Sequence, residues 1–77
     1  MAAPKFKVLD IRPMLARGHE PFALIRAEVD KLAPSRGLTV VAPFLPAPLI
    51  ELLKGEGFES SLERRTDGAW AVNFWRP

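Results

Sequence analysis

Short runs of apolar and alternating residues along this chain predict four β-strands. Residues 5–11 and 38–42 are strand-length runs rich in apolar and β-branched side chains. Residues 58–65 and 69–76 form another pair of strands around Thr66-Asp67-Gly68. The Asp-Gly dipeptide favours a type I′ hairpin turn, in which both central residues have positive φ. The second half of the chain therefore predicts a β-hairpin.

Two segments between these strands have the periodicity of amphipathic helices. The first helix is expected from Pro21 to about Leu32, since proline suits a first helical turn. Its apolar side chains recur three and four residues apart and predict one buried stripe: Phe22, Ile25, Val29 and Leu32. The segment from Pro13 to Glu20, ahead of this helix, is expected to be a loop.

A second, shorter helix is expected to begin at Pro46-Ala-Pro48. Leu49, Leu52 and Leu53 form its predicted inner face, and the glycines at 55 and 57 are suited to end it. The loop before it contains Phe44 and Leu45 between prolines. This apolar pair either packs under the helix or forms a contact patch on the surface.

The order of elements, β-α-β-α-β-β, determines the predicted fold class. Right-handed crossovers place both helices on one face of the sheet, and the final hairpin adds an antiparallel strand. We therefore expect an α+β, two-layer sandwich with a four-stranded mixed sheet, formed by residues 1–77 as one domain. Alternation along the last strand directs Trp70 toward the core and Trp75 toward the open face.

Composition narrows the function classes further. Apolar residues make up 48% of the 77 residues, which suits a globular protein. Eleven basic and nine acidic side chains give a net charge of +2, which is weak evidence for nucleic-acid binding. The sequence has neither a signal-peptide pattern nor the ~20 consecutive apolar residues of a membrane span. A cytoplasmic protein without membrane contact is the expectation.

The absence of cysteine from the sequence excludes disulfides, thiol nucleophiles and persulfide chemistry. A single histidine, His19, excludes a multi-histidine metal site within one chain. The sequence shows no nucleophile with a base and no glycine-rich phosphate loop. We therefore expect a protein that is not an enzyme and carries no cofactor.

Two motifs around the first helix resemble a known family. The run Leu9-Asp10-Ile11-Arg12, followed by a helix that opens at Glu20-Pro21, resembles the TusA/SirA-like sulfur carriers. Those domains share the β-α-β-α-β-β order and carry a Cys-Pro-x-Pro motif before the first helix. The Pro-x-Pro-Leu at 46–49, the Arg-rich third strand and the Trp-containing last strand resemble a cysteine-free branch more closely. That branch is a bacterial domain of unknown function, sometimes fused to or encoded near hemerythrin-like proteins.

The resemblance implies a scaffold without the family's chemistry. Aligning Pro21 with the second proline of Cys-Pro-x-Pro places Gly18 at the cysteine, His19 at the first proline and Glu20 at the variable position. Sulfur transfer is therefore not expected. What the resemblance implies is the fold, a docking surface, and partners among hemerythrin-like or sulfur-relay and redox proteins.

Seven residues are candidates for binding, each with a structural alternative. They are Arg12, Arg17, Gly18, His19, Glu20, Phe44 and Trp75. Arg12 and Arg17, with free amides before Phe22, could form an anion site, whereas Arg12 could instead pair with Asp10 and fix the loop. His19 is either a contact residue or ligand, or an exposed histidine without a role. Glu20 is expected to place negative charge at a helix N-terminus, and Trp75 either forms an interface or covers a sheet edge.

Three function classes fit this pattern. The leading hypothesis is a non-catalytic protein-interaction module with a sulfur-carrier-like fold. The alternative is a domain that binds a small ligand, an anion or a metal, with His19 and Glu20 of two chains completing a metal site across a dimer. RNA binding is less favoured, because Glu59 and Glu63 would repel phosphates on the sheet.

Overall fold

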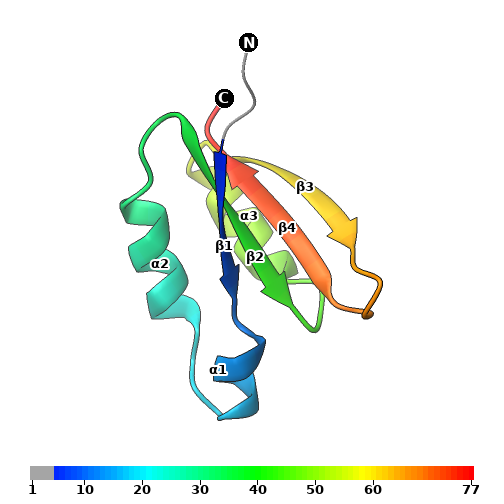
Figure 1. Cartoon of the computed structure of the whole chain (residues 1–77). Helices are drawn as coiled ribbons and strands as arrows, with labels where there is room; N and C mark the ends of the chain where they lie inside the picture. The colour runs from blue at the N-terminus through cyan, green and yellow to red at the C-terminus, as the bar shows by residue number, and fades with distance from the viewer. Residues whose placement is uncertain (1–4) are drawn as a thin grey trace.

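A computed structural model describes residues 5–77 as a mixed sheet with helices packed against it (Figure 1). The elements in chain order are β1 (Lys5–Asp10), α1 (Arg12–Ala16), α2 (Phe22–Asp30), β2 (Arg36–Ala42), α3 (Ala47–Gly55), β3 (Glu59–Arg64) and β4 (Trp70–Trp75). The strands lie in the order β1-β2-β4-β3, with β1 parallel to β2 and the other pairs antiparallel. The predicted α+β fold with a four-stranded mixed sheet is confirmed.

Helix α1 replaces most of the loop that the sequence predicted. Pro13 lies in its first turn, and Gly18, with φ of 74°, follows its end. The His19 N–H donates to the Met14 carbonyl at 2.9 Å, and the Gly18 N–H donates to the Leu15 carbonyl at 3.0 Å. This pair of bonds is a Schellman motif, which satisfies carbonyls at a helix end. The loop prediction was wrong because the combination of an early proline and a following glycine marks a short helix.

Helices α2 and α3 bury side chains against the same face of the sheet. The buried core consists of Ile11, Ile25, Val29, Leu38, Val40, Ala42, Leu49, Leu53, Phe58, Val72 and Phe74. Two side chains that periodicity assigned to the core lie outside it, since Phe22 and Leu52 are 46% and 40% exposed. Trp70 is also outside the core: it is half-buried at the start of β4, with the Arg64 guanidinium 4.8 Å from its ring centroid.

The β3–β4 hairpin turn differs from the predicted type I′ turn. Within residues 5–77 positive φ occurs only at glycines, so Asp67 does not adopt the required conformation. Gly68 has φ of 86°, and the Arg65 N–H donates to the Ala69 carbonyl at 2.8 Å. The turn is therefore a three-residue loop that ends in a left-handed glycine.

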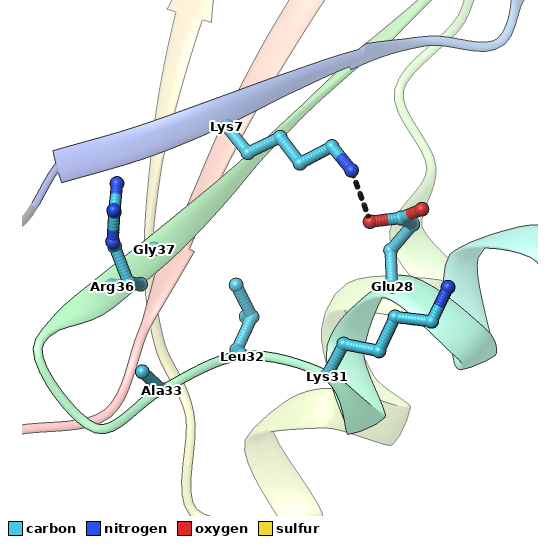
Figure 2. A pocket seen from close by; sticks show the side chains of 7 residues that line it. All are labelled: Lys7, Glu28, Lys31, Leu32, Ala33, Arg36 and Gly37. Atoms are coloured by element: carbon cyan, nitrogen blue, oxygen red, sulfur yellow. Dashed lines mark hydrogen bonds and ion pairs between the residues drawn. The ribbon is translucent and has the colours of Figure 1, made fainter.

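Two ion-paired bridges attach α2 to the rest of the molecule. Lys7 Nζ on β1 lies 2.7 Å from Glu28 Oε2 on α2 (Figure 2). On α2, Arg26 makes two hydrogen bonds of 2.6 and 2.8 Å to the Glu56 carboxylate, which follows α3, and another of 2.9 Å to Asp30. These contacts connect α2 with the edge strand on one side and with α3 on the other.

Candidate functional site

A groove of about 480 Å³ opens between the N-terminal ends of α2 and α3. It lies beside Ile11, the residue that follows β1. We call it the apolar groove, and its lining residues are Ile11, Glu20, Pro21, Phe22, Ile25, Phe44, Pro46, Pro48, Leu49 and Leu52. Nine of these ten residues have no charged or polar side chain, so the groove suits an apolar occupant.

The floor and the walls of the apolar groove differ in exposure. Ile11 and Ile25 are buried in the core and form part of the floor. The walls are large side chains that remain in contact with water: Phe22, Phe44 and Leu52 are 46%, 52% and 40% exposed. Covering these three side chains would remove apolar surface from water, which is the main favourable term in most protein association.

Prolines position the helices that form this groove. Pro21 caps α2, with φ of −85°, and Pro46 caps α3, with φ of −82°. Pro48 occupies the first turn of α3. Because proline restricts φ and has no N–H to satisfy, both helix starts are held with little conformational freedom. The groove is therefore preformed, which lowers the entropic cost of binding.

Glu20 lies at the rim of the groove, directly before the N-cap residue Pro21, and its side chain binds the first turn of α2. Its Oε1 accepts a 2.7 Å hydrogen bond from the Phe22 N–H, one of the amides that the first turn leaves without a helical partner. The expectation that Glu20 places negative charge at this helix N-terminus agrees with the contact. The same contact occupies an amide that an anion bound at this end would need.

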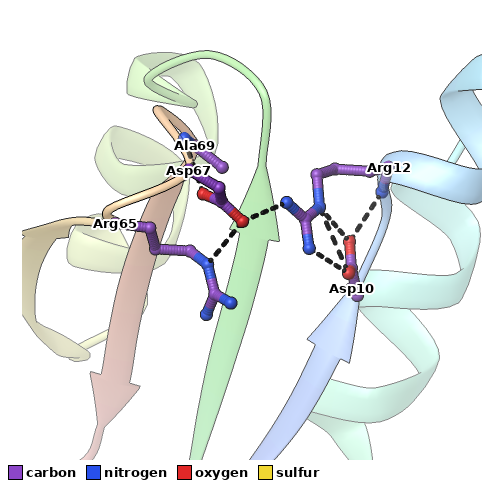
Figure 3. A network of polar contacts seen from close by, with 5 residues as sticks. All are labelled: Asp10, Arg12, Arg65, Asp67 and Ala69. Carbon is purple, nitrogen blue, oxygen red and sulfur yellow. Dashed lines mark hydrogen bonds and ion pairs between the residues drawn. The ribbon is translucent and has the colours of Figure 1, made fainter.

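Arg12 lies in a network of ion pairs away from the groove, at the end of the open sheet face (Figure 3). Its Nη2 is 2.7 Å from Asp10 Oδ2, and its Nη1 is 2.8 Å from Asp67 Oδ2. The Ala69 N–H and the Arg12 guanidinium hold the pKa of Asp67 down to about 2. The hydrogen bond from Arg12 also lowers the pKa of Asp10. Arg12 therefore does not join Arg17 in an anion site, and it takes the structural role that the sequence offered as the alternative.

The other candidate residues occupy two different places. Arg17, Gly18 and His19 are exposed in the turn between α1 and α2, next to the groove along the chain but not in its lining. Trp75 lies on the opposite face of the sheet, where its ring meets Phe6 edge-on, with the ring centroids 6.1 Å apart and an interplanar angle of 83°. Of the seven candidates, Glu20 and Phe44 line the apolar groove.

The sequence did not identify Phe22 and Leu52 as walls of this site. Helical periodicity marks both as inward-facing, and it cannot tell a packed position from one facing a gap between two helices. A usable signal was present in the prolines: Pro21, Pro46 and Pro48 bring two helix starts with aromatic neighbours to the same end of the sheet.

Residues 5–77 contain no group of three or more histidine, cysteine, aspartate or glutamate side chains placed to hold a metal ion. None of the helices within this range has the length and hydropathy needed to span a bilayer.

Comparison with known proteins gives one match. Residues 8–76 match a family described as an uncharacterized conserved protein, DUF2249. No curated protein and no solved structure matches the chain. The family match extends from β1 to the residue after β4 and so includes every residue of the apolar groove. The chain therefore belongs to the DUF2249 family.

Proposed function

We propose that this chain is a non-catalytic protein-interaction module that receives an apolar segment of a partner protein in the apolar groove. The observation that carries the proposal is the exposure of Phe22, Phe44 and Leu52 around one preformed hollow. Large exposed side chains gathered at one place mark interaction sites far more often than scattered ones do. Aromatic residues are also enriched among the residues that contribute most binding energy.

The chemistry of the chain supports recognition rather than catalysis. The sequence has no cysteine, so the sulfur chemistry of the TusA/SirA-like carriers that it resembles has no attacking atom here. Gly18, which aligns with the carrier cysteine, has positive φ and caps α1. The position thus has a structural use that glycine serves best. A bacterial, cytoplasmic adaptor that keeps a sulfur-carrier-like fold is the proposal that follows.

The surroundings of the groove indicate the chemistry of its partner. Arg17 and His19 are exposed in the turn that leads to Pro21. A partner segment with apolar side chains for the groove and a carboxylate that faces Arg17 would fit these surroundings, since opposite charges direct association. Hemerythrin-like and sulfur-relay or redox proteins are the partner classes that the family resemblance suggests.

Binding to a purified hemerythrin-like protein from the same genome, measured by calorimetry, tests the proposal. Phe44→Ala should weaken binding about tenfold or more, because truncating a central aromatic removes at least about 1.4 kcal/mol. Leu62→Ala is the matched control, since Leu62 on β3 is equally apolar, is 49% exposed and lies outside the groove. It should bind as the wild type does.

Equal losses in Phe44→Ala and Leu62→Ala would contradict the groove as the contact site. Failure of the hemerythrin-like protein and of a sulfur-relay protein to bind at high micromolar concentration would contradict the partner classes. Both variants change exposed side chains, so their amide spectra should show the wild-type fold.

A small apolar ligand is the second candidate for the same groove. Its volume of about 480 Å³ lies within the ~300–1,000 Å³ range of small-molecule sites. A fluorescent apolar dye that binds wild type but not Phe44→Ala, and that a protein partner fails to displace, would favour this candidate. Displacement of the dye by the partner would favour the protein-binding proposal.

A further inference from the structure

A second cavity, of about 530 Å³, lies at the other end of α2 and of β1 (Figure 2). Its lining residues are Lys7, Glu28, Lys31, Leu32, Ala33, Arg36 and Gly37. They come from β1, from the C-terminal end of α2, from the connection that follows it, and from the first two residues of β2. None of them lines the apolar groove, so the two hollows are separate. We call this one the basic cavity.

The charges of the basic cavity do not balance. It has three cationic side chains and one carboxylate, which leaves two positive charges in excess. The carboxylate, Glu28, is held by Lys7 at 2.7 Å. Among the ion pairs formed by residues 5–77, none includes Lys31 or Arg36. Arg36 therefore borders the hollow without an acidic partner in the described chain, whereas the charge of Lys31 acts on Glu28 and helps to lower the pKa of that carboxyl.

The cavity also has an apolar surface beside these charges. Figure 2 shows Arg36 and Lys31 on either side of Leu32, with the Lys31 side chain extending away from Arg36 on the side of Glu28. Leu32 is half-buried and packs against the core, so this surface is held in place. The cavity thus combines a fixed apolar surface with two cationic groups that form no ion pair in the described chain. A ligand that fits needs both an anionic head and an organic part.

We propose that the basic cavity binds an organic phosphate monoester, with its phosphate held by Arg36, its organic part on Leu32, and the exposed side chain of Lys31 as a second cation. A phosphate monoester carries close to two negative charges at neutral pH, which matches the excess charge of the cavity. The guanidinium of Arg36 can donate two parallel hydrogen bonds to phosphate oxygens, and Lys31 supplies a point charge. This site is independent of the protein-binding groove.

The affinity should be modest. Lys31 caps the carbonyl end of α2, whose partial negative charge offsets part of the cavity's charge. Both cations are exposed and are screened by salt. A dissociation constant in about the millimolar range is expected for a small ligand held by two such contacts.

Titration of ¹⁵N-labelled protein with phenyl phosphate, at constant ionic strength, tests the proposal. Amide shifts should change at residues 28–37 and at Lys7. Inorganic phosphate should bind more weakly than phenyl phosphate, and phenol should produce no change. Arg36→Gln should weaken phenyl phosphate binding about tenfold, the change expected for loss of one charge-assisted contact.

Two further variants separate a specific site from general attraction to basic residues. Glu28→Gln removes the one carboxylate of the cavity and should strengthen binding several-fold. Lys54→Gln, on α3 and outside the cavity, removes an exposed cation and should leave binding unchanged. Equal weakening in Arg36→Gln and Lys54→Gln, or shifts spread over all basic surfaces, would overturn the proposal. Arg36 and Lys54 are exposed, whereas Glu28 is largely covered and pairs with Lys7, so the amide spectrum of each variant is compared with the wild-type spectrum before the titration.

Discussion

Arg12 and Asp67 are 55 residues apart in the sequence, and Arg12 Nη1 lies 2.8 Å from Asp67 Oδ2 in the structure. The contact joins the first residue of α1 to the β3–β4 hairpin turn, and in Figure 3 the Arg12 side chain extends toward the end of β2 to make it. Asp67 also accepts a hydrogen bond of 3.0 Å from the Ala69 N–H. One carboxylate therefore shapes the hairpin turn and connects it to the start of α1.

This network should make stability depend on pH in the acidic range. The pKa of Asp67 is about 2 in the folded chain, below its usual value near 4. A carboxylate with a depressed pKa contributes stability that is present above the unfolded value and is lost as pH falls through the folded value. Urea midpoints should therefore decrease from about pH 4 to pH 2.

Asp67→Asn should reduce the urea midpoint at pH 7 and flatten its decline below pH 4. The asparagine oxygen can still accept a hydrogen bond from the Ala69 N–H. The decrease in the urea midpoint therefore measures the contribution of the Asp67 charge alone. Glu51→Gln changes an exposed carboxylate of α3, and its urea midpoint should vary with pH as the wild-type midpoint does. If Asp67→Asn also runs parallel to the wild type down to pH 2, the network does not stabilise the fold.

Leu52 and Leu53 are neighbours in α3 with opposite surroundings. Leu53 is 1% exposed and belongs to the core, whereas Leu52 is a wall of the apolar groove. Leu53→Ala should lower the free energy of unfolding by about 2–5 kcal/mol, because a buried cavity remains. Leu52→Ala should lower it by less than about 1 kcal/mol and should weaken partner binding. Chemical denaturation of both variants distinguishes the two roles. Similar decreases in the free energy of unfolding would contradict the placement of Leu53 in the core and of Leu52 on the groove wall.

Substitution by alanine should change the stability of the chain in opposite directions at Gly18 and at Gly55. Gly18 has φ of 74°, a conformation that costs an alanine about 1 kcal/mol although its Cβ would meet no neighbour within 4 Å. Gly55 is helical, and a Cβ added to it would also meet no neighbour within 4 Å. Gly55→Ala should therefore raise the free energy of unfolding by about 0.5–1 kcal/mol. Thermal unfolding measures both shifts. A stabilised Gly18→Ala would show that the α1 cap does not need a left-handed residue.

Glu20→Ala should destabilise α2 locally. Loss of the 2.7 Å bond to the Phe22 N–H leaves that amide without its side-chain acceptor, at a cost of about 0.5–2 kcal/mol. Hydrogen exchange should become faster at Phe22 and in the first turn of α2. Glu20→Gln keeps an oxygen acceptor and should reduce the stability of the first turn of α2 by less than Glu20→Ala does. Unchanged exchange in Glu20→Ala would contradict the capping role.

The segment that the resemblance to sulfur carriers points to lies next to the apolar groove, but most of the residues that it predicts do not line the groove. The alignment with a reactive motif predicts a role for Gly18 and His19, whereas the neighbouring groove is lined by Phe22 and by residues of α3. Phe44, predicted as a contact residue because an apolar pair between prolines is unusual for a loop, lines the apolar groove and is 52% exposed. Arg12 was named for a charge that Asp10 and Asp67 neutralise.

The sequence by itself determined the strands, the two longer helices and the α+β class, because periodicity and turn residues are local and the handedness of crossovers is general. Only the tertiary structure decided which inward-facing side chains enter the core. Phe22 and Leu52 face a gap whose width depends on how α2 and α3 pack, and no local pattern encodes that distance. The pairing of Arg12 with Asp67 and the grouping of Lys7, Lys31 and Arg36 likewise depend on segments that meet only after the sheet forms.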